Sequence, residues 1–406
     1  MRKHHENHRK SSHRIDVCYT LLCHFICKSK EKSWNSWLFR EKNVTLQHKC
    51  KNQSIWTFSM DNISSKRIEY IDALRGMTMI LVVYSHIARW GFDNVHMAYN
   101  DIFIRFRMPI FFFISGWLFF KIERIWNKST IYSILKKKFM VQIIPFLFFM
   151  SLYMFLFNAP EYHSSFEGKY GYWFTFSLFQ YFVIYIAIES LLNKQRTNKN
   201  ELIVMIIMFV LSFTAYYYEH IKFFADLGIW RPILSILSFS KIKYIIFFWL
   251  GTFVKKNFSS FIHITDNQYL IALCIGIFIS LHIWPYSTNL GFDFISFLLS
   301  GATGIIIIFT FFRKNKTHFS KNKKIGAVLQ YIGQRTLDIY LLHYFILPYH
   351  MNSMGIWLSQ HSSKSIDMII ILFISLWIIA ISLLISNIIR LSPFLGHYLF
   401  GVKNRL

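Results

Sequence analysis

The sequence predicts an all-α integral membrane protein with about ten transmembrane helices and both termini in the cytoplasm. Of its 406 residues, 54% are hydrophobic and only 16% are charged, and long apolar runs recur along the chain. A helix of about 20 apolar residues crosses the roughly 30 Å hydrocarbon core of a bilayer. Ten runs are candidate spans: residues 74–91, 102–120, 141–157, 173–192, 202–218, 244–254, 269–286, 294–312, 336–350 and 367–389.

Positive charge decides the predicted orientation. A formal net charge of +25 is compatible with nucleic-acid binding, but the Lys and Arg residues cluster in short segments between the apolar runs. This is the distribution of cytoplasmic loops in membrane proteins. The basic loops alternate along the chain (121–140, 193–201, 255–268 and 313–335), which places them and both termini in the cytoplasm. We expect a bilayer environment and no nucleic-acid partner.

Residues 1–59 differ from the rest of the chain. They are rich in Lys, His, Asn and Ser, and their longest apolar run is about 17–27. That run is too short for a spanning helix and lacks the cleavage site of a signal peptide. We expect Met60 to be the biological start, residues 60–406 to form the membrane domain, and residues 1–59 to be a disordered or artefactual extension.

The first apolar run carries two ionisable residues in one helical stripe. Arg75 and His86 are eleven positions apart, which returns to within roughly 20° of the same helix face and rises roughly 16 Å. An ionisable residue inside a membrane is a functional-site hypothesis, and a neutral imidazole is a general base for a hydroxyl proton. Asp72, three positions before Arg75, can pair with it or orient it. The alternatives are that Arg75 snorkels to headgroups and that His86 only bonds a neighbouring helix.

Two later runs contribute candidate binding residues. Arg107 lies at the predicted outer end of the second run, where it could hold an anionic or carbonyl-bearing group or anchor to headgroups. Gly116, in the same run, favours the close approach of another helix or an acyl chain. Trp173 opens the fourth run and fits an aromatic belt at the interface, with stacking on a sugar as the alternative.

The second half of the chain adds two further candidates. Arg231 lies in 219–243, the longest predicted outward segment, and could contribute to a substrate site that faces outward. His343 lies in the ninth run, eight residues beyond Arg335, which places it at a depth comparable to that of His86. We interpret His343 as a residue that orients or packs rather than as the base. No set of carboxylates, His or Cys residues has metal-ligand spacing, so no metal is expected.

Five segments together resemble the membrane acyltransferase family 3. The stretch IDALRGMTMILVVYSH is similar to the opening signature of that family, an arginine and a histidine separated by ten residues on the first span. Within the family, FRMPIFFFISG most resembles enzymes grouped with fucose 4-O-acetylases. In the fourth span, the Trp-Phe-Leu-Tyr-like run usual in the family reads Trp173-Phe174-Thr175-Phe176, so this sequence departs from the family at Thr175 and Phe176. The other similar segments are PIFFFISGWLF, YWFTFSLFQYFVIY, FFWLGTFV and LDIYLLHYFILP.

The resemblance implies transfer of an acyl group, usually acetyl from acetyl-CoA, to a hydroxyl of an envelope or exported carbohydrate. It assigns Arg75 and His86 as the functional pair and implies a multi-pass protein of a bacterial-type inner membrane. His86 would act as the base or carry the acyl group transiently. The alternatives are a glycan or lipid exporter or flippase that uses buried Arg and His residues as gating or proton-relay groups, and a scaffold subunit.

Overall fold

The structure is a computed structural model, and it describes residues 67–92, 99–121, 124–157, 166–192, 198–220, 230–283, 289–348 and 351–401. Within these ranges the chain forms helices and no strands, which confirms the all-α class. The predicted extension 1–59 lies outside the described residues, and its assignment stays a prediction. The helices below belong to one unit that begins at Ile68.

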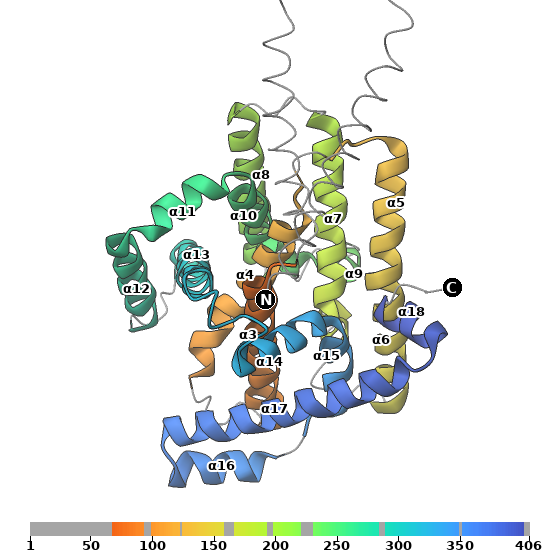
Figure 1. The fold of residues 1–406 in the computed structure, drawn as a ribbon, viewed down its shortest axis with the longest axis vertical. Coiled ribbons are helices and arrows are strands. Elements are labelled where there is room, and N and C mark those ends of the chain that lie inside the picture. Colours follow the sequence, from red (N-terminus) through yellow and green to blue (C-terminus); the bar gives the residue numbers. More distant parts are fainter. Residues whose placement is uncertain are drawn as a thin grey trace, which may run out of the picture. The chain divides into compact units, whose positions relative to one another are not determined.

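Within the described residues, the first half of the unit (Figure 1) forms the helices α3 to α8 and three shorter helical segments. A π-helical turn, Ile87–Gly91 (η1), continues the first of them without a break. The elements are α3 (Glu69–His86), α4 (Asn100–Phe119), α5 (Lys128–Lys138), η2 (Phe139–Ile143), α6 (Ile144–Phe157), η4 (Phe166–Gly171), α7 (Trp173–Leu192) and α8 (Asn198–His220).

The second half returns to the first helix and packs against it. In Figure 1, α17 crosses α3 and α15, and it contacts both. The elements are α9 (Trp230–Ile236), η6 (Phe239–Tyr244), α10 (Ile245–Lys256), α11 (Phe258–Asp266), α12 (Gln268–Ile283), α13 (Leu290–Lys314), α14 (Lys324–Gln334), α15 (Thr336–Leu342), η7 (His343–Phe345), α16 (Asn352–His361), α17 (Lys364–Ile389) and α18 (Pro393–Phe400).

Seven single helices in the described ranges are long and apolar enough to cross a membrane. An eighth span results if the pair α11 and α12, bent by 82°, is counted as one. The protein is therefore a multi-pass membrane protein, while the count of ten and the orientation of the termini are not confirmed. The seven helices are α3 with η1, α4, α5 continued into α6, α7, α8, α13 and α17.

Two predicted spans form shorter helices. Run 244–254 forms α10, of 12 residues, and run 336–350 forms the seven-residue α15 followed by η7. At 1.5 Å per residue, α10 is about 18 Å long, which is less than the thickness of the hydrocarbon core. Most of its apolar residues, Phe247, Phe248 and Trp249 among them, are instead buried, and it packs along α4. The sequence pattern of a buried core helix is the same as that of a short span.

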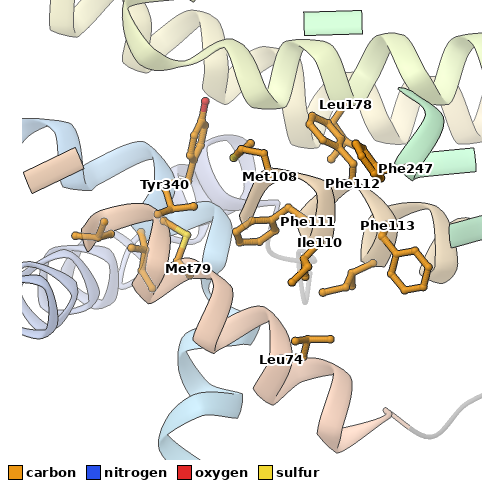
Figure 2. Packing of buried hydrophobic residues seen from close by; sticks show 14 of the residues in the cluster. Leu74, Met79, Met108, Ile110, Phe111, Phe112, Phe113, Leu178, Phe247 and Tyr340 are labelled. Atoms are coloured by element: carbon orange, nitrogen blue, oxygen red, sulfur yellow. The ribbon is translucent and has the colours of Figure 1, made fainter. Parts of the chain in front are cut away.

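Helix α3 lies at the centre of the packing. Within its most apolar window, 78% of the residues are buried inside the protein, compared with 28% for α17. It contacts α4, α13, α14, α15 and α17. Figure 2 shows side chains of α3, α4, α7, α10 and α15 that meet in one apolar cluster, among them Met79, Met108, Phe112 and Tyr340. The helix that carries Arg75 and His86 is therefore held from several sides.

Glycines allow the closest helix contacts. A Cβ on Gly76 of α3 would overlap the carbonyl oxygen of Leu329, and one on Gly333 of α14 would overlap that of Asp72. A Cβ on Gly116 of α4 would likewise overlap a backbone carbonyl of α10. This confirms that Gly116 permits close approach of another helix. Such contacts bring whole backbones together, so they fix the distance between helices.

The Gly333→Ala substitution is expected to destabilise the protein. The added methyl group must displace the backbone of α3, and overpacking of this kind costs about 1–3 kcal/mol. Thermal unfolding of purified protein in detergent measures the effect. Gly276→Ala is the matched control, because a Cβ on this glycine of α12 meets nothing within 4 Å. Equal Tm values for the two variants would contradict the α3–α14 contact.

Candidate active site

Two buried histidines meet where α3 ends and α15 gives way to η7. His86 is the last residue of α3, and His343 is the first residue of η7. His86 Nδ1 lies 2.7 Å from His343 Nε2, and the two side chains are 8% and 0% exposed. The rings of Trp90 and Tyr344 stack on His86, with centroids 4.4 and 5.3 Å away. Sequence reasoning named both histidines, and the structure brings them into direct contact.

The hydrogen-bond partners determine the tautomers of this pair. His343 Nδ1 lies 2.9 Å from the carbonyl oxygen of Ile339. A carbonyl only accepts, so His343 Nδ1 carries the hydrogen. In a neutral His343, Nε2 is then the acceptor, and His86 Nδ1 donates to it. The lone pair of His86 therefore lies on Nε2, which is the atom able to take a proton from a substrate.

We expect His343 to act as a positioning residue. His343→Leu removes the acceptor for His86 Nδ1, and hydrogen bonds to groups that become charged contribute about 1.5–3 kcal/mol, or roughly a 10- to 100-fold change in kcat. His343→Gln keeps an acceptor oxygen and should recover part of the rate, with KM for the acyl donor unchanged in both. Acyl-transfer kinetics of purified variants check this. Equal kcat for the two variants would show that the ring only packs.

Arg75 connects α3 to the start of α15. Its Nη2 donates to Thr336 Oγ1 at 2.8 Å, and Nη1 lies 3.8 Å from Asp72 Oδ1. Asp72 in turn accepts from Gln334 Nε2 at 3.2 Å. The pairing of Asp72 with Arg75 is therefore observed. Together with His86 and His343, these bonds tie α3 to the α14–α15 segment at two levels, eleven residues apart on α3.

A cavity of about 520 Å³ lies beside this helix pair. One part of its wall is basic and includes Arg75 of α3. Another part is apolar, with Met108, Phe111 and Phe174 among the lining residues. The remaining basic lining residues are Lys121, Arg124, Lys137 and Lys138. This cavity can therefore accept a ligand that is anionic at one end and apolar at the other.

The cavity approaches the histidine pair along both helices. Val82 and Tyr340 line the cavity, and they lie one helical turn before His86 and His343, respectively. Arg107 also reaches this region, because its Nη1 donates to the carbonyl oxygen of Val82 at 3.3 Å. The cavity wall and the imidazoles are therefore separated by a single helical turn.

Three other predicted residues occupy different positions. Arg107 is only 9% exposed, a burial that does not fit an anchor to headgroups. Trp173 is half-buried, and its ring stacks on that of Tyr244 at 5.8 Å with an interplanar angle of 21°; it does not line the cavity. Arg231 belongs to α9, but its side chain lies outside the described residues.

Sequence reasoning missed two tyrosines beside His343. The hydroxyls of Tyr340 and Tyr344 donate to the carbonyl oxygen of Gly171, at 3.0 and 2.8 Å. Gly171 has φ +92°, a conformation that favours glycine, and a Cβ there would overlap the Tyr344 ring. These bonds fix the segment before α7 against the helix that carries His343. The signal was the pair of tyrosines that flank the histidine in IYLLHYF.

The side chains of the site are of the kinds that carry out acid–base chemistry. Among the described residues, no three His, Cys, Asp or Glu side chains lie together as a metal site would require. The groups are two imidazoles in contact at the end of α3 and, eleven residues earlier on the same helix, the Arg75 guanidinium on the wall of a largely apolar cavity. Such a set can bind an anion, orient a carbonyl compound and move one proton.

Comparison with known families gives the family of the chain. The family model Acyl_transf_3, described as an acyltransferase domain, matches residues 68–387. The chain belongs to this family. The match begins just before α3 and ends within α17, so this membrane acyltransferase domain contains both histidines and every cavity residue. No curated protein and no solved structure matches the chain.

Proposed function

We propose that this acyltransferase moves an acyl group, acetyl in the simplest case, from acyl-CoA to a hydroxyl of an envelope or exported carbohydrate. The observation that carries the proposal is the His86–His343 pair, one helical turn from a cavity that is basic on one side and apolar on the other. The similarity of FRMPIFFFISG to sugar O-acetyltransferases supports the carbohydrate acceptor. The protein would work in a bacterial-type inner membrane.

In the proposed reaction His86 is the general base. The acceptor oxygen attacks the thioester carbonyl carbon while its proton passes to His86 Nε2. The carbon–sulfur bond then breaks, and the CoA thiolate leaves with the proton returned from His86. His343 accepts from His86 Nδ1 throughout, so it stabilises the imidazolium that forms.

Arg75 would help to hold the donor. It lines the cavity, and Thr336 and Asp72 hold its guanidinium in one position, from which its N–H groups can donate to a phosphate oxygen. Lys121 and Arg124 lie between α4 and α5, whereas Lys137 and Lys138 lie on α5, so the predicted loop 121–140 is helical from residue 128 onward. The charge distribution assigns this segment to the cytoplasm, where acyl-CoA is found. Trp173 and Arg231 remain candidates for contact with the carbohydrate that accepts the acyl group.

The test is release of free thiol from acetyl-CoA by purified protein in proteoliposomes, with and without an envelope glycan fraction. Acceptor-dependent release, together with an alkali-labile acetyl ester on the glycan, is the expected result. An exporter would move intact glycan across the vesicle membrane and consume no thioester. A ternary-complex rate law supports His86 as base, whereas ping-pong kinetics would indicate an acyl-imidazole intermediate.

A further inference from the structure

Four basic side chains surround one part of the cavity. Lys121 and Arg124 come from the segment after α4, and Lys137 and Lys138 come from the last turn of α5. Within the described ranges, none of the four forms an ion pair with a carboxylate. By contrast, Arg75 on the same cavity is paired with Asp72. This part of the wall therefore concentrates positive charge that the described chain does not neutralise.

Aromatic rings hold two of these cations in place. The Lys138 ammonium lies 3.8 Å from the ring centroid of Phe182 and 5.2 Å from that of Phe119. The Arg124 guanidinium lies 4.7 Å from the same Phe119 ring and 5.2 Å from that of Trp126. Cation–π contacts orient a cation and stabilise it, but they leave its charge in place. The two cations thus share Phe119 as a common support.

Arg124 also has unused hydrogen-bonding capacity. Its Nη1 is buried and has no hydrogen-bond partner within the described part of the chain. Burial lowers the pKa of the Arg124 guanidinium, because the charged form loses hydration. A buried donor without a partner and a group of like charges both cost free energy. A ligand with several phosphate oxygens would offset both costs.

We propose that Lys121, Arg124, Lys137 and Lys138 form a site for the 3′-phosphate of the acyl donor, and that this site selects CoA thioesters over thioesters without the 3′-phosphate. The inference rests on the proposed function. Along α4, the cavity-lining residues Leu118, Ile114, Phe111 and Met108 follow one another from the end next to Lys121 back toward Arg107, which contacts the carbonyl oxygen of Val82. A pantetheine arm could follow this apolar row of side chains. The selection would therefore be made at the opposite end of the donor from the reacting carbonyl.

The experiment compares two donors, acetyl-CoA and acetyl-3′-dephospho-CoA, in wild-type protein and in Lys138→Gln and Arg124→Gln variants. For the wild type, loss of the 3′-phosphate should raise KM by about 10- to 100-fold, the range for charge-assisted hydrogen bonds, with kcat unchanged. In the variants KM for acetyl-CoA should rise toward the dephospho value, while KM for acetyl-3′-dephospho-CoA changes little. Lys136→Gln is the matched control, because Lys136 is an exposed neighbour on α5 outside the cavity wall.

Several outcomes would overturn the inference. Equal KM for the two donors in the wild type would show that the 3′-phosphate is not recognised. Anionic lipid is a second source of phosphate, so the assay is repeated in phosphatidylcholine vesicles with and without phosphatidylglycerol. A lipid dependence that Lys138→Gln removes, with the donor preference unchanged, would assign the site to a headgroup. Absence of any transfer from acetyl-CoA, with the protein folded, would instead refute the proposed function.

Discussion

Replacement of His86 by alanine is expected to abolish acyl transfer. Loss of a positioned general base lowers the rate by about 10²- to 10⁴-fold. In this protein the loss should lie at the upper end, because the other imidazole that the structure describes beside His86 is that of His343, which is 0% exposed and lies behind His86. The rate of thiol release from acetyl-CoA by purified protein measures the effect.

Ser85→Ala is the matched control for this substitution. Ser85 is the preceding residue of α3, is 1% exposed, and its hydroxyl makes no hydrogen bond within the described chain. Truncation at this position tests the same part of the helix without touching the imidazole pair. We expect near wild-type kcat for Ser85→Ala and equal yields of folded protein for both variants. Full activity in His86→Ala would remove the histidine from the chemistry.

Replacement of Asp338 by alanine is expected to cause the largest loss of stability. Asp338 lies on α15, is 2% exposed, and accepts from Arg390 Nε at 2.9 Å, from Arg390 Nη2 at 3.0 Å and from Arg335 Nη1 at 3.3 Å. Ser386 also donates to it. Removing the carboxylate leaves two arginines uncompensated, and breaking a buried ion pair in this way costs about 3–5 kcal/mol.

The Asp338→Ala substitution should also lower the activity of the enzyme. Asp338 connects α15 to the end of α17, and α15 leads directly to His343. We therefore expect Asp338→Ala to lower both Tm in detergent and kcat. Asp266→Ala is the control, because Asp266 pairs with Arg313 but is half-exposed, and a pair of that kind contributes about 0–1 kcal/mol. A drop in Tm no larger than that of the control would contradict the buried network.

Local features of the chain were predictable from sequence. The positions of Arg75 and His86 on one helix follow from spacing alone, and α3 is continuous from Glu69 to His86. The pairing of Asp72 with Arg75 is also local, since the residues are three apart. The all-α membrane class follows from composition and run length. In each case the property depends on residues within a few helical turns.

Tertiary features were not predictable in the same way. Contact between His86 and His343 joins residues that are far apart in the chain, and no periodicity encodes it. The burial of Arg107 likewise depends on how α4 packs against α3. The predicted count of ten spans was not confirmed, in part because two of the predicted spans form the short buried helices α10 and α15. A buried helix and a spanning helix are equally apolar, so the sequence does not distinguish them. From sequence, the cluster Lys136–Lys138 was interpreted as a topology determinant, with phosphate attraction for a nucleotide-bearing donor as the alternative. That Lys137 and Lys138 line the cavity, and Lys136 does not, follows only from the packing of α5.

The most direct test of the central claim follows radiolabelled acetyl groups from acetyl-CoA into envelope carbohydrate. It uses membranes that contain the wild-type protein, the His86→Ala variant or neither, at equal protein levels and with a native acceptor present. The account predicts label in the carbohydrate with the wild type and background label in the other two. Equal label in all three membranes would contradict it.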